Sequence, residues 1–384
     1  MKKKRKILFV TERRADYSRL KPILRLTQQS RKLKMYLVLA GSHLLKGFGE
    51  TKRVIEDDGF SIDAIVPMFH ERGSDTGAAM ARGMGRALIA LTGVMERLRP
   101  DIVFCGFDLG AHLAAAIAAM HQNIHVAHIQ GGEVSGTIDE ILRHATTKFA
   151  HLHFAATPQS KRRIIRLGED PRFVFLVGSP SVDTMRSISY PPKDALAARY
   201  GFDPKKKLIL FSQHPVTTEV RNVLSQIRES IDALREAAKE HNADIVAIYS
   251  NADAGGRRIV AELKRSGFAV FPHIVYEDFL RLMKVADMLV GNSSAGIHEA
   301  PFYHLPVVNI GTRQQRRERG AHVIDATHEK RSILKAVRAA LRDMRFRKRA
   351  RTGVNPYDRG PTAKKVVRIL ETVKLPSIQK VITY

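Results

Sequence analysis

Short apolar runs rich in β-branched and aromatic residues alternate with helical patterns along the whole chain. In the first half the runs are KILFVTE, KMYLVLAG, DIVFCG, IHVAHIQG, LHFAAT and FVFLVGSP, and in the second half KLILFSQ, DIVAIYS, DMLVGN and PVVNIG. A strand buried on both faces of a parallel sheet reads as continuous apolar sequence, so this alternation predicts parallel sheets covered by helices on both sides. The 384 residues are enough for two such units. We therefore predict an α/β protein with two doubly wound, Rossmann-like domains.

A turn-rich passage separates the two groups of runs. It begins with GSPSVD at 178–183 and continues through YPPKD and GFDPKKK. Proline, glycine and aspartate at this density are typical of a connection between domains. We predict an N-terminal domain over residues 1–185, a second domain over 206–362, and a C-terminal helix and tail over 363–384.

Composition restricts the class of protein. The longest apolar run outside the strands, Leu113 to Met120, is far shorter than the roughly 20 residues of a membrane span, and the N-terminus lacks a signal-length apolar region. We expect a cytoplasmic protein with no membrane partner. Cys105 is the single cysteine of the chain, which excludes an internal disulfide, and its place at the end of an apolar run predicts a buried thiol.

The formal net charge is +26, and basic residues cluster at 2–6, 161–166, 313–319 and 345–351. A field of this sign attracts phosphate-bearing partners. The clusters lack interleaved aromatic residues, and the chain has no zinc-finger, RNP or GXXG signature. Nucleic-acid binding is therefore not expected despite the charge.

Polar loops follow the ends of the apolar runs, where doubly wound sheets bind their ligands. They include TERRADYS, GSHL, an aspartate at Asp108, SQHPVTT, NADAGG and GNSSAGIHE. We expect these loops to converge on one interdomain cleft. In the stretch from His128 to Lys148, Thr137 and Glu140 have the spacing of a capping box, which predicts a helix from near Ile138 with Asp139 and Arg143 on one face.

The loop GNSSAGIHE at 291–299 suits a nucleotide. Its hydroxyls and backbone N–H groups precede a predicted helix and suit a diphosphate, while Glu299 is placed to accept from both ribose hydroxyls. Arg14 follows the first run, where a dinucleotide fold would have glycines. No GxGxxG or Walker motif is present, and the histidines lack ligand spacing. We therefore expect neither a nicotinamide, nor a metal, nor any other cofactor.

Several motifs in collinear order resemble one family. These are RADYSRLKPI, GSHL, FGETKRVIEDDGF, GGEVSGTIDEILRHATTK, QHPVTT, NADAG, GNSSAGIHE and NIGTRQ. Together they resemble the hydrolysing UDP-N-acetylglucosamine 2-epimerase family, of the type that serves sialic-acid and nonulosonic-acid synthesis, such as the epimerase domain of the bifunctional animal enzyme. The resemblance covers about residues 6 to 370.

The resemblance implies a glycosyltransferase-B-like fold whose C-terminal helix packs back on the first domain. It implies an enzyme that splits UDP-GlcNAc, or a related UDP- or GDP-linked acetamido sugar, by anti elimination of the nucleotide followed by hydration. The products are the nucleotide and the free 2-epimer. We also expect a homodimer or homotetramer.

Motif by motif, the resemblance implies a catalytic group and a nucleotide-binding group. Asp108 and Asp139 match catalytic acids, His214 matches a histidine near the phosphate, and Arg143 lies beside them. The residues that match the nucleotide site are Arg14, Ala15, Ser18, His43, Asn251, Ser293, Ser294, Glu299 and Arg313.

Two departures from the family pattern bear on catalysis. The family usually has Gly-Asp-Arg where this chain has Phe107-Asp108-Leu109, and commonly a catalytic glutamate where this chain has Gln130. Glu133 is a candidate substitute that we expect to point elsewhere on the turn. Two alternatives therefore remain open, namely a nucleotide-sugar glycosyltransferase of the same fold and a sugar-nucleotide sensor that has lost turnover.

Overall fold

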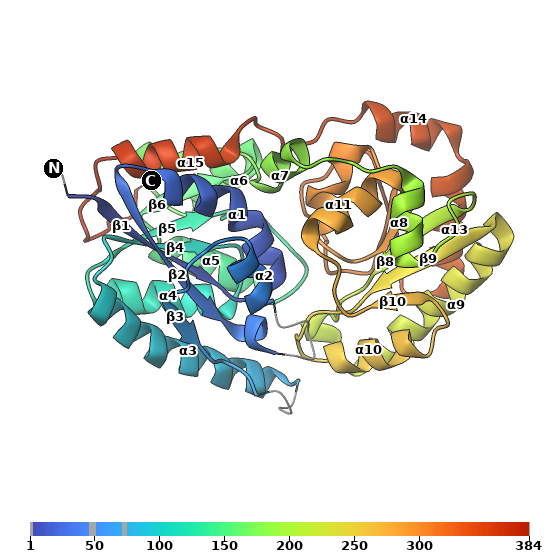
Figure 1. Cartoon of the computed structure of the whole chain (residues 1–384), viewed down its shortest axis with the longest axis horizontal. Helices are drawn as coiled ribbons and strands as arrows, with labels where there is room; N and C mark the ends of the chain where they lie inside the picture. Colours follow the sequence, from blue (N-terminus) through green and yellow to red (C-terminus); the bar gives the residue numbers. More distant parts are fainter. Residues whose placement is uncertain (1–2, 46–50, 71–74, 384) are drawn as a thin grey trace. The chain divides into compact units, whose positions relative to one another are not determined.

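The computed structural model describes residues 3–45, 51–70 and 75–383. Contacts within the chain define two compact units (Figure 1). Unit 1 comprises Met1–Glu133, Ile138–Thr184 and Tyr357–Tyr384, and unit 2 comprises Val134–Thr137 and Met185–Pro356. Residues 48–50 of the motif FGETKRVIEDDGF lie outside the described residues.

The described part of unit 1 contains a seven-stranded parallel sheet in the order β3-β2-β1-β4-β5-β6-β7. Its strands are β1 (Arg5–Thr11), β2 (Leu33–Ala40), β3 (Ala64–Val66), β4 (Ile102–Gly106), β5 (His125–Ile129), β6 (Leu152–Ala155) and β7 (Val174–Leu176). Its helices are α1 (Arg14–Gln29), α2 (Lys52–Asp57), α3 (Gly77–Leu98), α4 (Gly110–His121), α5 (Asp139–Phe149), α6 (Pro158–Arg166) and α15 (Thr362–Thr372), with 3₁₀ turns at Gly41–Leu44 and Pro171–Phe173. The strand order reverses between β1 and β4, which is the switch point where such sheets bind ligands.

Alternate side chains of β1 enter two different cores, as the pleat of a strand requires. Ile7 and Phe9 pack with residues of α1 and α15, whereas Leu8 and Val10 pack with residues of α3 and α4. In Figure 1 these helix pairs cover opposite sides of the unit 1 sheet. This burial on both faces explains why the strand reads as a continuous apolar run.

The C-terminal helix α15 belongs to unit 1 although it follows all of unit 2 in sequence. At its start, the Asp183 carboxylate accepts the backbone N–H groups of Thr362 and Ala363. At its end, the Arg5 guanidinium donates to the carbonyls of Leu370 and Val373. Both termini of α15 are therefore satisfied by side chains of unit 1.

The described part of unit 2 contains a six-stranded parallel sheet in the order β10-β9-β8-β11-β12-β13, again reversing at the first strand. Its strands are β8 (Lys207–Ser212), β9 (Ala243–Ile248), β10 (Ala269–Phe271), β11 (Met288–Gly291), β12 (Val307–Ile310) and β13 (Val323–Ala326). Its helices are α8 (Lys193–Tyr200), α9 (Val223–His241), α10 (Gly256–Lys264), α11 (Tyr276–Val285), α12 (Ala295–His298), α13 (Lys330–Arg342) and α14 (Met344–Thr352), with 3₁₀ turns at Thr217–Asn222 and Ala300–Tyr303. Helix α7 (Ser181–Ser187) crosses from unit 1 into unit 2.

The predicted fold class is confirmed, because both sheets are parallel and doubly wound and every predicted apolar run forms a strand. Strands β3, β10 and β13 lie at sheet edges and were not predicted. Cys105 is buried as predicted, and burial raises the pKa of its thiol. None of the helices built by residues 3–45, 51–70 and 75–383 has the length and apolarity to cross a membrane.

Candidate active site

The polar loops of unit 1 lie at the switch point of its sheet. Glu12, Arg13 and Arg14 follow β1, and Asp108 follows β4 two residues after its last strand residue. Gln130 and its neighbours follow β5, the next strand in the sheet. The parallel sheet thus brings three chemically active loops to one edge.

Two of these loops contain non-glycine residues in the left-handed backbone region. Phe107 has φ 65° and Gln130 has φ 58°, and such conformations cost about 1–3 kcal/mol each and are concentrated at functional sites. His128 helps to fix Phe107, because its Nε2 hydrogen bonds to the Phe107 carbonyl at 3.0 Å. The strain coincides with the positions where this chain departs from the family pattern.

The turn after β5 folds back on itself. Gly132 has φ 72°, and a Cβ at this position would collide with the Ser160 carbonyl oxygen, so the turn requires glycine. The reversal brings the Glu133 carboxylate to Gln130, whose Nε2 donates to Glu133 Oε1 at 2.9 Å. The expectation that Glu133 points elsewhere on the turn is therefore wrong, because two left-handed residues curl the chain between positions 130 and 133.

Arg143 interacts with three acidic residues of unit 1. Its side chain is 1% exposed, its Nη1 donates to the Glu133 carbonyl at 2.9 Å, and its Nη2 donates to the Asp108 carboxylate. Burial opposes its charge, but the carboxylates of Asp108, Glu133 and Asp139 outweigh burial and raise the pKa of Arg143. The site thus collects three carboxylates around one fully charged guanidinium.

Helix α5 delivers Arg143 and Asp139 and begins next to Ile138 as predicted, but its cap differs from the prediction. The N-cap is Ile138 rather than Thr137, so the predicted capping box of Thr137 and Glu140 does not begin this helix. An isoleucine side chain cannot accept a backbone N–H. Asp139 and Glu140 occupy the first turn, where the helix dipole favours their charge.

A buried polar network joins the loops after β1 and β4. The Asp16 carboxylate accepts the backbone N–H groups of Glu12 and Arg13 and a hydrogen bond from His112 Nε2 at 2.9 Å. His112 Nδ1 in turn accepts the N–H of Gly106 at 2.9 Å, so the proton of the neutral ring is on Nε2. Burial alone would raise the pKa of Asp16, but these hydrogen bonds and neighbouring charges lower it. An ionised Asp16 therefore fixes the loop that carries Arg13 and Arg14 relative to the loop that carries Asp108.

The predicted nucleotide-binding residues of unit 1 have different surroundings. Burial lowers the pKa of Arg14 to about 10, which leaves it charged at neutral pH. Ala15 is exposed and Ser18 is buried. His43 is fully buried, and its two ring nitrogens bond to Thr11 Oγ1 at 2.9 Å and Thr51 Oγ1 at 2.6 Å. The structure therefore gives His43 a role inside the protein, while its contact with a nucleotide stays a prediction.

In unit 2, Asn292 holds the loop that carries His214. Its Oδ1 accepts the His214 N–H at 2.7 Å, and its Nδ2 donates to the His214 carbonyl at 2.9 Å. The backbone N–H of Asn251 donates to His214 Nδ1 at 3.1 Å, so the neutral ring carries its proton on Nε2. The loops after β8, β9 and β11 are thus joined around one imidazole.

The remaining nucleotide-binding candidates of unit 2 cluster after β11 and β12. Glu299 is 1% exposed and accepts from Tyr276 OH at 3.2 Å. Arg313 Nη1 and Gln314 Nε2 both donate to the carbonyl of Asn292, next to Ser293. The helix predicted after Ser294 is only the four-residue α12, so its dipole contributes less to anion binding than a full helix would.

Sequence reasoning missed Asp16, His112, Asn292 and Gln314. Asp16 carried a signal, since it is the third residue of α1, where a carboxylate caps the helix start. His112 carried none, because a histidine within the alanine-rich α4 gives no sign of its partner from a distant loop. No set of His, Cys, Asp and Glu side chains in the described part of the chain is arranged to hold a metal ion.

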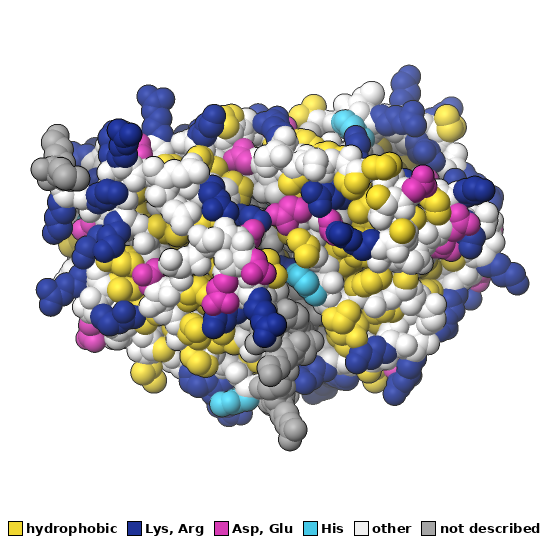
Figure 2. Space-filling view, in the orientation of Figure 1, with side chains coloured by type: hydrophobic (Ala, Val, Ile, Leu, Met, Phe, Trp, Pro, Cys, Tyr) yellow, Lys and Arg dark blue, Asp and Glu magenta, His cyan; other side chains and the backbone are white. Residues whose placement is uncertain are grey.

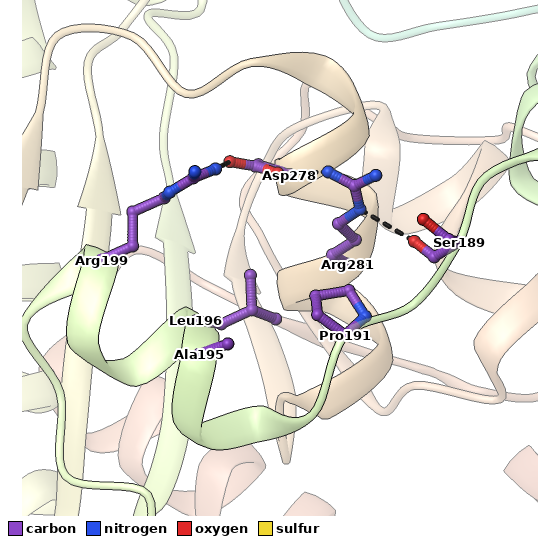
Figure 3. A pocket seen from close by; sticks show the side chains of 7 residues that line it. All are labelled: Ser189, Pro191, Ala195, Leu196, Arg199, Asp278 and Arg281. Carbon is purple, nitrogen blue, oxygen red and sulfur yellow. Dashed lines mark hydrogen bonds and ion pairs between the residues drawn. The ribbon is translucent and has the colours of Figure 1, made fainter.

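Unit 2 also contains a cavity of about 270 Å³ (Figure 3). It is lined by Ser189, Pro191, Ala195, Leu196, Arg199, Asp278 and Arg281. The Asp278 carboxylate accepts from Arg199 at 2.5 Å, Tyr200 OH at 2.6 Å and Arg281 at 2.7 Å. Its charge is thus matched within the unit, and the cavity contains none of the predicted site residues.

Comparison with known proteins gives consistent matches over most of the chain. Residues 25–371 match the family model described as UDP-N-acetylglucosamine 2-epimerase. The chain is 37% identical to a Legionella pneumophila protein named UDP-N,N'-diacetylbacillosamine 2-epimerase (hydrolyzing), over 97% of each chain. It is 32% identical to a UDP-N-acetylglucosamine 2-epimerase of Neisseria meningitidis, over 88% of this chain and 87% of that protein.

A solved structure is similar over nearly the whole length. It is the UDP-GlcNAc 2-epimerase from Neisseria meningitidis bound to UDP-GlcNAc, with a TM-score of 0.78 over 95% of this chain and 99% of that chain. The sequence identity in this comparison is 19%, so the likeness shows the fold alone.

Proposed function

Because the chain belongs to the UDP-N-acetylglucosamine 2-epimerase family and is a sugar-nucleotide 2-epimerase, we propose that it works by hydrolysis, releasing UDP and the free 2-epimer. The observation that carries this proposal is the cluster of Asp108, Glu133 and Asp139 around the buried guanidinium of Arg143. Elimination and hydration at neighbouring carbons need several proton-transfer groups in one place. Unit 1 supplies these groups at the ligand-binding edge of its sheet.

The reaction has two balanced steps. A base takes the proton from C2 while the bond between C1 and the phosphate oxygen breaks, so UDP leaves with the bonding pair and a 2-acetamidoglycal forms. Water then adds its hydroxyl to C1, and C2 receives a proton on the opposite face. The sum is one sugar nucleotide and one water giving UDP and one 2-epimer.

We assign the C2 base to Glu133. Gln130 cannot take this proton, because an amide is not basic at neutral pH. Glu133 lies within hydrogen-bond distance of Gln130 Nε2, so its carboxylate is close to the position where the family commonly has the catalytic glutamate. Asp108 and Asp139 then supply the proton to C2 and accept one from water. Arg143 holds Asp108 and the Glu133 backbone in place and is a positioning residue for both.

The nucleotide is assigned mainly to unit 2. Asn251 donates to His214, and Arg313 donates to the carbonyl of Asn292, which holds the His214 loop. We assign these two residues, together with Ser293 and Ser294, as donors to the phosphate. Glu299 is assigned to the ribose hydroxyls, and its hydrogen bond from Tyr276 orients the carboxylate. Arg14, charged at neutral pH, is assigned to the phosphate as predicted.

For the sugar, we propose a UDP-linked diacetamido sugar in preference to UDP-GlcNAc. The Legionella relative named for UDP-N,N'-diacetylbacillosamine is 37% identical to this chain, against 32% for the Neisseria relative named for UDP-GlcNAc. Gln130 supports this choice, because an amide can both donate to and accept from a second acetamido group.

The test is to incubate the protein with each of these two sugar nucleotides and to follow UDP and free sugar by NMR. We expect UDP and the free 2-epimer from both, with the higher kcat/KM for the diacetamido sugar. An epimer still linked to UDP would refute hydrolysis, transfer to an added acceptor would indicate a glycosyltransferase, and binding without turnover would indicate a sensor. Glu133→Gln serves as the inactive control.

A further inference from the structure

Helix α14 presents a dense set of cations, of which Arg345 and Arg349 interact electrostatically with the capping carboxylate of Asp343. Its nine residues, MRFRKRART, include Arg345, Arg347, Lys348, Arg349 and Arg351, and none of these five forms an ion pair with an acid in the described part of the chain. Figure 2 shows dark blue side chains gathered over α14, at the upper right of the view. This helix therefore contributes directly to the excess charge of the molecule, which the sugar-nucleotide site leaves unexplained.

In the neighbouring helix α13, some cations do form ion pairs with acids. Its Arg338 pairs with Glu236 at 3.4 Å and Glu240 at 2.8 Å, and its Arg342 pairs with Glu240 at 3.1 Å. Arg338 and Arg342 of α13 are thus paired with acids of α9. On α14, Arg347 donates to the Leu341 carbonyl at 3.0 Å. The exposed cations of this helix are Arg345, Lys348, Arg349 and Arg351.

Helix α14 is held rigidly by its opposite face. Phe346 and Ala350 are each 3% exposed, and Phe346 packs into the core of unit 2. The Asp343 carboxylate accepts the N–H groups of Arg345 and Phe346 and so caps the helix start. The cations therefore project from a preformed helix, and a partner need not pay the entropy of folding it.

The outer face of α14 combines charge with apolar side chains. Met344, Lys348 and Thr352 are spaced four residues apart and form one exposed ridge opposite the buried stripe. Arg345 and Arg351 flank this ridge and are also exposed. Met344 is 76% exposed, and Val354, just beyond the helix end, is 79% exposed. A large apolar side chain thus stands near each end of the basic ridge.

We propose that this face, residues 344–354, binds peripherally to an anionic phospholipid surface. The cations match the negative headgroups, and Met344 and Val354 gain free energy only by entering an apolar environment, which a bilayer offers beneath its headgroups. Single-stranded RNA fits the face less well, because the aromatic ring of α14, Phe346, is buried and cannot stack on a base. Peripheral contact needs no membrane-spanning helix, so the expectation of no membrane partner is revised on this point alone.

The test uses the full chain and sedimentation with phosphatidylglycerol-containing vesicles and with phosphatidylcholine vesicles at about 0.1 M salt. The test variant carries Arg345→Gln, Lys348→Gln, Arg349→Gln and Arg351→Gln. The matched control, with the same loss of charge, carries Lys239→Gln, Lys284→Gln, Arg331→Gln and Lys335→Gln, all exposed cations of unit 2 outside α14. Each cation near an anionic surface contributes about fivefold, so we expect the test variant to bind anionic vesicles roughly 100- to 1,000-fold more weakly.

The control should bind within about tenfold of the wild type, and the wild type should not bind phosphatidylcholine vesicles. Equal loss in both variants would overturn the proposal, because general charge would then explain binding, and so would absence of binding to anionic vesicles. If the quadruple variant fails to fold, as judged by circular dichroism, the single changes Arg345→Gln and Arg351→Gln replace it, with about fivefold expected for each.

The double variant Met344→Ser and Val354→Ser separates a bilayer from RNA. We expect it to weaken vesicle binding by about tenfold, since it removes apolar surface that a bilayer would bury. Its binding to an oligouridine probe should stay unchanged. Oligouridine bound more tightly than anionic vesicles, with no effect of the double variant on either, would assign the face to nucleic acid instead.

Discussion

Replacing Arg143 with methionine should expose how strongly the acids of unit 1 depend on one cation. The guanidinium is 1% exposed and donates to both the Glu133 carbonyl and the Asp108 carboxylate. Methionine fills a similar volume but removes the guanidinium from the buried Glu133 and from Asp108, which is 19% exposed and keeps Arg13 at 3.9 Å. We therefore expect a cost near the lower end of the range for a broken buried pair, about 3 kcal/mol of unfolding free energy. Arg143→Lys keeps the charge and loses part of the planar fork, so it should cost about 1–2 kcal/mol.

The loss of unfolding free energy in Arg143→Met should depend on pH, because it arises from charged carboxylates. In Arg143→Met, like-charge repulsion raises the folded-state pKa of these carboxyls above the unfolded value. A raised carboxyl pKa destabilises the fold at pH above it, and the penalty is relieved as the pH falls and a proton binds. The deficit relative to wild type should therefore be largest near pH 7 and should shrink toward pH 5.

The unfolding free energy of each variant is measured by urea unfolding followed by far-UV circular dichroism, since the chain has no tryptophan for fluorescence. Arg172→Met is the matched control, because Arg172 pairs with Asp170 at 2.6 Å while its side chain is 81% exposed. Water screens that pair, so the urea midpoint of the control should hardly move. An Arg143→Met midpoint equal to that of the control, or a deficit that grows as the pH falls, would refute the reasoning.

Three further predictions concern single positions. His112→Gln and His112→Asn each keep one of the two hydrogen bonds of the ring. Both should lower kcat by about 10- to 100-fold with little change in KM. A KM that worsens by the same factor as kcat would indicate a merely structural role. Glu299→Ala should weaken UDP binding by about 1–3 kcal/mol in calorimetry, and unchanged affinity would remove the ribose assignment. Burial alone would raise the pKa of Glu169, but hydrogen bonds from His153, Lys148 and Lys380 hold it at about 2. The stability that this carboxylate contributes is present above pH 4.5 and is lost as the pH falls toward 2. Glu169→Gln should therefore flatten that part of an acid-unfolding curve. An unchanged curve would count against a stabilising role for the hydrogen bonds to Glu169.

The fold could be predicted because the central strands of both sheets are buried on both faces. In β1, residues 7–11 are all buried, so continuous apolar sequence was the expected pattern. The missed strands β3 and β10 have three residues each and lie at sheet edges, where side chains are only partly buried. Edge strands of that length leave too little apolar sequence to distinguish them from loops.

The candidate site was predictable in its location but not in its internal contacts. Polar residues after strands indicated the loops at the carboxyl ends of the strands, where Asp108 follows β4 at the switch point and Gln130 follows the neighbouring β5. The position of Glu133 depends on left-handed backbone at Gln130 and Gly132, which spacing alone does not reveal for a glutamine. The bond between His112 and Asp16 joins residues 96 apart in sequence, so only the folded chain brings them together. The domain limits and the roles of the site residues stay predictions for experiment.

The most direct test of the account is the fate of the C2 hydrogen during turnover in D₂O. We predict that NMR will find one deuterium at C2 of the released 2-epimer, because Glu133 removes the original proton and a solvent-derived one replaces it on the opposite face. Glu133→Gln should lower the rate by about 10²–10⁴-fold while UDP affinity stays nearly intact. A released 2-epimer that keeps its original C2 hydrogen, or a Glu133→Gln variant that turns over at the wild-type rate, would contradict the account.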